Sequence, residues 1–148
     1  MRYDRQIILP EIGEEGQNKL QKAKVLIVGV GGLGSPIALY LAGAGVGCLG
    51  LVDDDSVSIS NLQRQVLYSE EELGKPKVVC AAHRLTSLNS EIETRYYSTR
   101  LTAENADRII QEYDIVVDGC DNFDTRYLIN DICIKQGAGE SMTEHMRR

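Results

Sequence analysis

The chain has 148 residues, 43% of them hydrophobic, and a formal net charge of −6. This length predicts one domain with a buried core, and the negative charge argues against broad binding to nucleic acid or an anionic membrane. No apolar run reaches the roughly 18 residues that cross a bilayer, and the N-terminus lacks the apolar core of a signal peptide. We therefore expect a cytoplasmic protein without nucleic-acid or membrane partners.

The N-terminal segment carries two arginines, Arg2 and Arg5, before an apolar stretch. Such an arm is solvated unless an anionic site recruits it. Residues 13–22 are polar and compatible with a helix, which we expect to lie over the sheet edge with Leu20 as its main buried residue.

A glycine loop follows the first expected strand, residues 24–30. Gly29, Gly31 and Gly34 match the G-x-G-x-x-G pattern, in which the first glycine makes a tight turn, the second admits a phosphate and the third permits close helix packing. The pattern predicts a nucleotide site, although a glycine-rich turn without a ligand gives the same letters.

A helix over residues 35–44 is expected after the loop, with Ser35 as its N-cap and Pro36 in its first turn. The free amides and the positive dipole end of this helix predict an anion site.

Three acids, Asp53, Asp54 and Asp55, end the next expected strand, residues 49–52. Asp53 follows the loop by about 20 residues, where a Rossmann-type unit places an acid on the ribose hydroxyls. A solvated acidic turn is the alternative.

The next ten residues, 56–65, are rich in Ser, Asn, Gln and Arg. A polar linker would explain that composition but not the apolar residues within and beside it. We expect these residues to pin the segment to the body, so that Arg64 becomes a placed phosphate ligand. They are Val57, Ile59, Leu62 and Val66.

Two lysines, Lys75 and Lys77, open a helix expected over residues 75–87. Lysines in a first turn oppose the helix dipole, which suggests a nearby anion; lysines screened by water are the alternative. The expected apolar side of this helix consists of Val78, Val79, Ala82, Leu85 and Leu88.

The remaining pattern predicts strands over 92–97 and 114–118 and helices over 102–113 and 124–135. This β-α alternation predicts an α/β fold, a Rossmann-like parallel sheet with helices on both faces and strand order 3-2-1-4. The crevice between strands 1 and 4 would then gather the glycine loop, Asp53 and the pair Asp121 and Asn122. Because Asp121 would repel phosphates unless Mg²⁺ lies between, the set indicates a Mg-nucleoside triphosphate.

A nicotinamide cofactor would use the same glycine loop and the same Asp53. An NAD-dependent dehydrogenase, however, leaves Arg5, Arg64, Lys77 and Asp121 unexplained.

Four cysteines, Cys48, Cys80, Cys120 and Cys133, are widely separated and are expected to be core residues. They lack the close pairing of a structural zinc site, and the two histidines suggest neither a metal site nor a triad.

Taken together, these motifs resemble the ThiF/MoeB family, the bacterial relatives of ubiquitin-activating enzymes, from about residue 2 to residue 137. The matching segments are residues 2–7, 29–34, 53–55, 60–65, 74–77 and 118–122. Family members use ATP and Mg²⁺ to adenylate the C-terminal glycine of a small ubiquitin-like sulfur carrier, in thiamine or molybdopterin biosynthesis, and release pyrophosphate.

The resemblance implies a role for each matched residue. The loop amides, Gly32 among them, approach the phosphates, while Asp53 holds the ribose and Asp121 organises Mg²⁺. Arg5 is the arginine that the partner subunit of a homodimer contributes. The catalytic residues are then Arg5, Arg64, Lys77 and Asp121. The nucleotide-binding residues are Gly29, Gly31, Gly32, Gly34, Asp53, Asp55, Ser60, Asn61, Leu62, Gln63, Arg64, Lys77, Asp121 and Asn122.

Family members continue with more strands, two C-x-x-C zinc pairs and a crossover loop. Residues 137–148 do not resemble the next expected strand. We therefore expect an ATP-binding adenylation domain over 1–137, a divergent tail over 138–148, a fold truncated at its C-terminal end, and no zinc ligands. A nucleotide-binding fragment or partner-binding module without turnover is the alternative function.

Overall fold

The computed structural model describes residues 2–120 and 123–136. The predictions for Asp121, Asn122 and the tail over 138–148 lie outside these residues.

Four parallel strands form one sheet in the order β3-β2-β1-β4, which confirms the predicted order. Because all four strands are parallel, their carboxyl ends lie at the same edge of the sheet. The strands are β1 (Lys24–Val28), β2 (Cys48–Val52), β3 (Glu93–Tyr97) and β4 (Ile115–Asp118).

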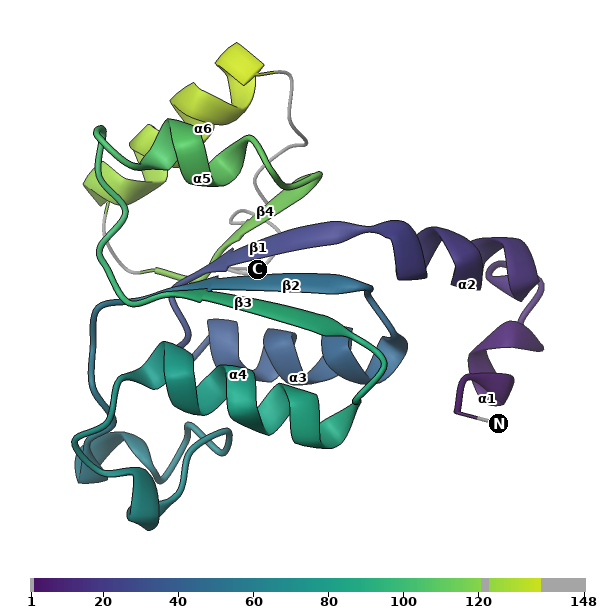
Figure 1. Cartoon of the computed structure of the whole chain (residues 1–148), viewed down its shortest axis with the longest axis horizontal. Helices are drawn as coiled ribbons and strands as arrows, with labels where there is room; N and C mark the ends of the chain where they lie inside the picture. The colour runs from purple at the N-terminus through teal and green to yellow at the C-terminus, as the bar shows by residue number, and fades with distance from the viewer. Residues whose placement is uncertain (1, 121–122, 137–148) are drawn as a thin grey trace.

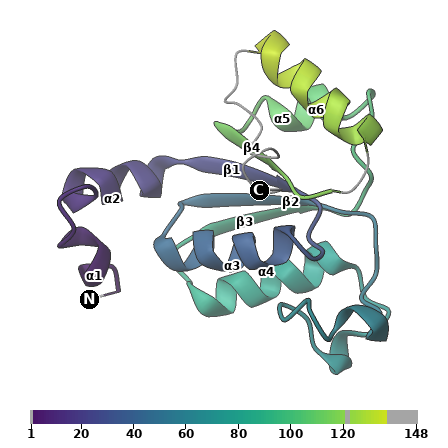
Figure 2. The same cartoon turned by 180° about the vertical axis from the view of Figure 1, so that it is seen from behind.

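Helices cover both faces of the sheet, as Figures 1 and 2 show. One face carries α3 (Gly34–Ala44) and α4 (Lys77–Leu88), and the other carries α5 (Ala106–Ile110) and α6 (Phe123–Gln136). Two separate apolar clusters fill the spaces between sheet and helices. The Rossmann-like α/β fold is therefore confirmed.

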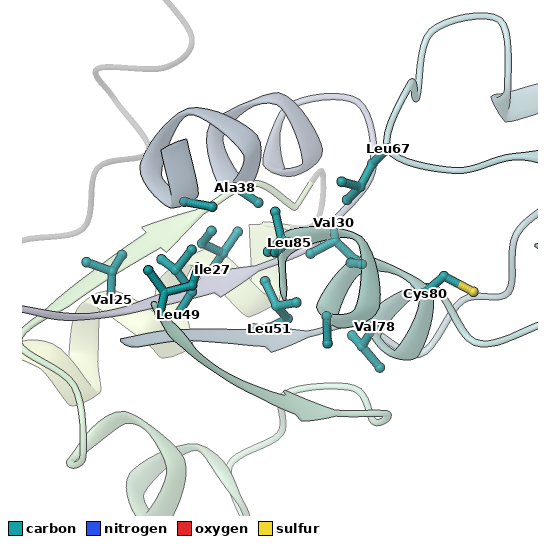
Figure 3. Packing of buried hydrophobic residues seen from close by; sticks show 14 of the residues in the cluster. Val25, Ile27, Val30, Ala38, Leu49, Leu51, Leu67, Val78, Cys80 and Leu85 are labelled. Carbon is teal, nitrogen blue, oxygen red and sulfur yellow. The ribbon is translucent and has the colours of Figure 1, made fainter. Parts of the chain in front are cut away.

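The larger cluster lies under α3 and α4 (Figure 3). Ile27, Leu49 and Leu51 project from the sheet and are 0% exposed. Ala38 on α3 is also fully buried, and its small side chain lets the helix backbone approach the strands. This close approach fixes where the start of α3 meets the ends of the strands.

Two short helices, α1 (Asp4–Ile7) and α2 (Gly13–Lys22), extend beyond the end of the sheet where the strands begin (Figure 1). The buried residue of α2 is Gln17 at 3% exposure, and Leu20 is only partly buried, so the prediction for Leu20 was wrong. Gln17 is buried because its amide donates to the Ala44 carbonyl oxygen at 3.2 Å and its oxygen accepts from Gln6.

The predicted apolar side of α4 is confirmed for Val78, Ala82 and Leu85, which are buried, and wrong for its other two residues. Val79 and Leu88 are 40% and 39% exposed, whereas Cys80 and Ala81 are buried. The buried residues Val78, Ala81, Ala82 and Leu85 are spaced i, i+3, i+4 and i+7 and so form one face of the helix, and Val79 lies beside it. Within the described residues, no helix combines the length and apolarity needed to cross a membrane.

Candidate functional site

A pocket of about 700 Å³ opens at the edge of the sheet where the strands end. Five chain segments meet there: the glycine loop after β1, the acids after β2, the loop that leads into α4, and the segments that follow β3 and β4. Its lining residues are Val28, Gly29, Gly31, Gly32, Leu33, Val52, Asp53, Asp54, Asp55, Asn61, Arg64, Gln65, Lys77, Thr99, Arg100, Leu101, Gly119, Cys120 and Thr125.

The glycine loop is packed backbone against backbone at two of its glycines. Gly29 has φ +90°, in the left-handed region that favours glycine, and a Cβ there would lie 3.0 Å from the backbone of Gly119. A Cβ on Gly34 would overlap the carbonyl oxygen of Gly29. Gly34 therefore serves the packing of α3 and does not line the pocket.

Gly31 and Gly32 do line the pocket, and a Cβ on Gly32 would meet nothing within 4 Å. The predicted N-cap was wrong: α3 starts at Gly34, and Ser35 is buried with its hydroxyl donating to the Gly31 carbonyl oxygen. The start of α3 has no side-chain cap, and the Ser35 backbone amide donates to the Gly31 carbonyl oxygen at 3.1 Å.

Asp53 links the end of β2 to the glycine loop. Its Oδ2 accepts a hydrogen bond from the Val30 backbone amide at 2.9 Å, and its Oδ1 accepts one from the Asp55 amide at 2.7 Å. The side chain is half-buried rather than part of a fully solvated turn. Each oxygen retains a lone pair that can accept a ribose hydroxyl.

Carboxylate oxygens of Asp53, Asp54 and Asp55 lie within 4.8 Å of one another, the one such acidic group among the described residues. Hard oxygen donors of this kind suit a divalent cation, but exposed acids also gather without one. The predicted metal residue, Asp121, lies outside the described residues.

The two ends of the segment between the acids and α4, residues 56–76, are hydrogen-bonded to each other. Ser56 and Pro76 form an antiparallel bridge, and the Val57 amide donates to the Lys75 carbonyl oxygen at 2.9 Å. Two 3₁₀ turns, η1 (Ile59–Asn61) and η2 (Glu70–Glu72), shape the loop between. The chain therefore leaves and rejoins the body at nearly one point.

The pinning residues of this loop differ from those predicted. Val57 is buried and Leu62 packs against the core, but Ile59 and Val66 are each 68% exposed, so the prediction was wrong for them. Leu67 and Tyr68 are buried in their place.

Tyr68 joins the loop to the glycine loop, because its hydroxyl donates to the Val30 carbonyl oxygen at 2.7 Å. Burial, reinforced by the charge of Asp53, raises the pKa of Tyr68. The phenol therefore stays neutral and keeps donating.

The pinned loop brings Asn61, Arg64 and Gln65 to the pocket. Arg64 is exposed, and its Nη1 donates to the Ser60 carbonyl oxygen at 3.2 Å. The neighbouring residues that the family motif includes, Ser60, Leu62 and Gln63, are not among the lining residues.

Lys77 is 4% exposed and lines the pocket, while Lys75 is exposed. The Nζ of Lys77 lies 3.8 Å from Oδ2 of Asp55. The sequence predicted an anion near the start of α4, and within the chain that anion is the Asp55 carboxylate. The alternative, a lysine screened by water, fits only the exposed Lys75.

Arg5 lies far from this pocket in its own chain. It is exposed on α1, and the neighbouring Gln6 donates to the Ala44 carbonyl oxygen at 2.7 Å, at the last residue of α3. The pocket lies at the opposite end of α3, at Gly34. A single chain does not bring Arg5 to the site.

Several lining residues were missed by the sequence patterns. Thr99, Arg100 and Leu101 follow β3 and could have been found from their place after a parallel strand, since such ends share one edge. Cys120 was expected in the core, but it is half-buried and lines the pocket, with its thiol donating to Asp118 Oδ1 at 2.7 Å. The other three cysteines are buried as predicted.

The ThiF family model matches residues 3–139 of the chain. Among curated proteins, a sulfur carrier protein adenylyltransferase of Thermus thermophilus is 52% identical over 136 residues, which are 92% of this chain and 50% of that protein. The adenylyltransferase and sulfurtransferase MOCS3 of Culex quinquefasciatus is 56% identical over 133 residues, 90% of this chain and 30% of that protein. The chain thus spans half or less of these relatives' length.

Solved structures match the fold closely. The Escherichia coli tRNA N6-threonylcarbamoyladenosine dehydratase TcdA in complex with ATP aligns with a TM-score of 0.88 and 26% identity, over 95% of this chain and 57% of that chain. Escherichia coli MccB with ATP aligns with a TM-score of 0.81 and 32% identity, over 91% of this chain and 41% of that chain.

Proposed function

Because the chain belongs to the ThiF family, we propose that its pocket binds Mg-ATP and that it adenylates the C-terminal glycine of a small ubiquitin-like sulfur-carrier protein. Two kinds of relative support this proposal. The curated relatives are named for sulfur-carrier adenylation, and the structural relatives TcdA and MccB were solved with ATP.

The observation that carries the proposal is the convergence of two cations and the glycine loop on one pocket. Arg64 and Lys77 come from separate segments, yet both line the pocket beside Gly31 and Gly32. A triphosphate needs this combination of backbone amides and fixed positive charge. A nicotinamide dinucleotide carries only a diphosphate, so two fixed cations beside the glycine loop fit the more highly charged triphosphate better.

The chemistry follows from the charges. The carrier carboxylate oxygen attacks the α-phosphorus, forming the acyl-adenylate P–O bond, and the bond to the bridging oxygen breaks as pyrophosphate departs. Negative charge grows on the phosphoryl oxygens during this step, and Arg64 and Lys77 offset it. No side chain has to act as a covalent nucleophile, because the carrier itself attacks.

The remaining residues position the nucleotide. Asp53 binds the ribose hydroxyls with the lone pairs that its two backbone amides leave free, and Asn61 contacts the phosphates. We assign Mg²⁺ to Asp121, the third residue after β4 in the sequence; the ion would neutralise phosphate charge.

We further propose that residues 1–137 form the adenylation domain of a cytoplasmic homodimer. The position of Arg5 supports this: the arm is tied to the far end of α3, so its guanidinium can reach a pocket only in a second copy. The pathway served, thiamine or molybdopterin biosynthesis, depends on which carrier the protein accepts.

The test is ATP–pyrophosphate exchange with a carrier that ends in Gly-Gly, with mass spectrometry for the acyl-adenylate. We expect exchange and adenylate that require both ATP and the terminal glycine. ATP binding without exchange would contradict the adenylation step and leave a nucleotide-binding module. Stabilisation by NADH but not by Mg-ATP would overturn the proposal altogether.

The partner role of Arg5 is tested by mixing variants. Arg5→Ala and Arg64→Ala should each be inactive alone, whereas mixed dimers contain one intact site, so the mixture should recover part of the activity. A mixture as inactive as its components would exclude the shared site.

A further inference from the structure

One pocket residue, Gln65, has a buried polar atom that nothing in the described part of the chain satisfies. The side chain is 3% exposed, and its Oε1 is buried without a hydrogen-bond partner among the described residues. Its Nε2 faces the glycine loop, 3.5 Å from the position that a Cβ on Gly31 would occupy. Buried carboxamides are ordinarily paired, so this one requires a reason.

The other strongly buried glutamine, Gln17, shows the usual arrangement. It accepts from Gln6 and donates to the Ala44 carbonyl oxygen at 3.2 Å, so both ends of its carboxamide are used. Gln17 therefore stabilises the fold, whereas Gln65 leaves a desolvated oxygen unpaired and weakens it.

The loop holds Gln65 in this unfavourable position. The Gln65 amide donates to the Asn61 carbonyl oxygen at 2.9 Å, and the Gln65 carbonyl oxygen accepts from the Tyr68 amide at 3.2 Å. Tyr68 in turn is anchored to Val30 in the glycine loop. A methionine would fill the same volume without an unpaired oxygen, so fold stability does not explain a glutamine here.

We propose that Gln65 is a ligand of the nucleotide's phosphate chain, with Nε2, the end of the carboxamide that faces the glycine loop, donating a hydrogen bond to a phosphate oxygen. The unpaired Oε1 can only accept and does not contact the phosphate; its cost to fold stability is the reason to look for a function at Nε2. The inference rests on the proposed ATP site. A neutral donor suits this place because the pocket is already lined by charged side chains of both signs: three acids, and the cations Arg64, Lys77 and Arg100. The carboxamide adds direction without adding charge.

The test compares Gln65→Met and Gln65→Glu with wild type by calorimetric titration with Mg-ATP, tripolyphosphate and adenosine. Gln65→Met loses a hydrogen bond to a charged group, so its Kd for Mg-ATP and for tripolyphosphate should rise about tenfold or more. Gln65→Glu should weaken both further, because it adds a negative charge beside the phosphates. Adenosine, which has no phosphate, should bind all three proteins equally.

The unfolding midpoint without nucleotide gives the second measurement. Gln65→Met should unfold at the same or a higher temperature than wild type, whereas Gln17→Met, which breaks a paired amide, should unfold at a lower one. A Gln65→Met protein that is less stable but binds Mg-ATP as tightly as wild type would overturn the inference. Equal loss of adenosine and ATP binding would also overturn it, since it would place Gln65 away from the phosphates. Failure of wild type to bind ATP would overturn the proposed function as well.

Discussion

Lys77 and Asp55 are joined twice, through their side chains and through their backbones. The Nζ of Lys77 lies 3.8 Å from Asp55 Oδ2, and the Lys77 backbone amide donates to the Asp55 carbonyl oxygen at 2.9 Å. The lysine side chain is 5% exposed and the aspartate side chain 71% exposed. The buried Lys77 ammonium is thus held at the pocket wall by the Asp55 carboxylate. If a phosphate takes the place of this carboxylate as the partner of Lys77, water can solvate the exposed Asp55 side chain.

Removing the Lys77 charge should weaken nucleotide binding without weakening the fold. We expect Lys77→Met to raise the Kd for Mg-ATP about tenfold or more, the value of a hydrogen bond to a charged group. The free energy of unfolding should stay the same or rise, because a buried cation is replaced by an apolar chain. Calorimetry and denaturant titration measure the two quantities; unchanged ATP binding would remove Lys77 from the site.

Removing the Asp55 carboxylate should, in contrast, lower the free energy of unfolding. Asp55→Asn leaves the Lys77 ammonium buried without its partner and should lower the free energy of unfolding by about 1–2 kcal/mol. In a Lys77→Met background the same change should cost almost nothing, since there is no buried charge to leave unpaired. Equal losses in both backgrounds would show that the pair is not coupled.

Arg64 is expected to be essential for turnover but not for folding. Arg64→Ala should lower ATP–pyrophosphate exchange by about 10²–10³-fold, because it removes a cation from the developing phosphoryl charge. Its unfolding midpoint should match wild type, since the side chain is exposed. Arg108→Ala, an exposed arginine on α5, is the matched control and should retain full exchange.

The two kinds of glycine in the loop should respond differently to alanine. Gly34→Ala places a methyl group onto the Gly29 carbonyl oxygen and should cost about 3 kcal/mol or more of unfolding free energy. Gly32→Ala meets open space and should leave the thermal midpoint unchanged. If Gly34→Ala were as stable as wild type, α3 and the glycine loop could not be packed as closely as the structure has them.

The Tyr68 hydrogen bond should give stability a recognisable pH dependence. Tyr68→Phe leaves the Val30 carbonyl oxygen unpaired and should cost about 1–2 kcal/mol near pH 8. Burial raises the Tyr68 pKa above its ordinary 10.0, so its contribution is complete below pH 10 and is lost as the pH rises further.

The difference in free energy of unfolding between wild type and Tyr68→Phe should therefore become smaller above pH 10. Tyr113, whose pKa burial also raises, is present in both proteins and cancels from the difference. If this difference in unfolding free energy stayed constant up to pH 11, the pH dependence assigned to the Tyr68 hydroxyl would be wrong.

Most of the fold could be predicted because its signals are local. Apolar runs such as residues 25–28 and 116–117, alternating with helical segments, specify buried parallel strands, and the strand order follows the Rossmann arrangement. The glycines and acids of the site were likewise predicted at the right edge, because parallel strands end together. Residues after β3, such as Arg100, were missed because no motif marks them, although their place after a parallel strand could have indicated them.

Only the tertiary structure decided which side chains are buried and which are paired with one another. The sequence by itself determined the segments that meet at the pocket: the glycine loop, the Asp53 turn, the Arg64 loop and the start of α4. Only folding paired Asp55 with Lys77, buried Gln65 with an unsatisfied oxygen, exposed Val66 and moved Arg5 to the far end of α3. The physical reason is that burial and pairing depend on contacts between segments distant along the chain, while periodicity and spacing report only on neighbours.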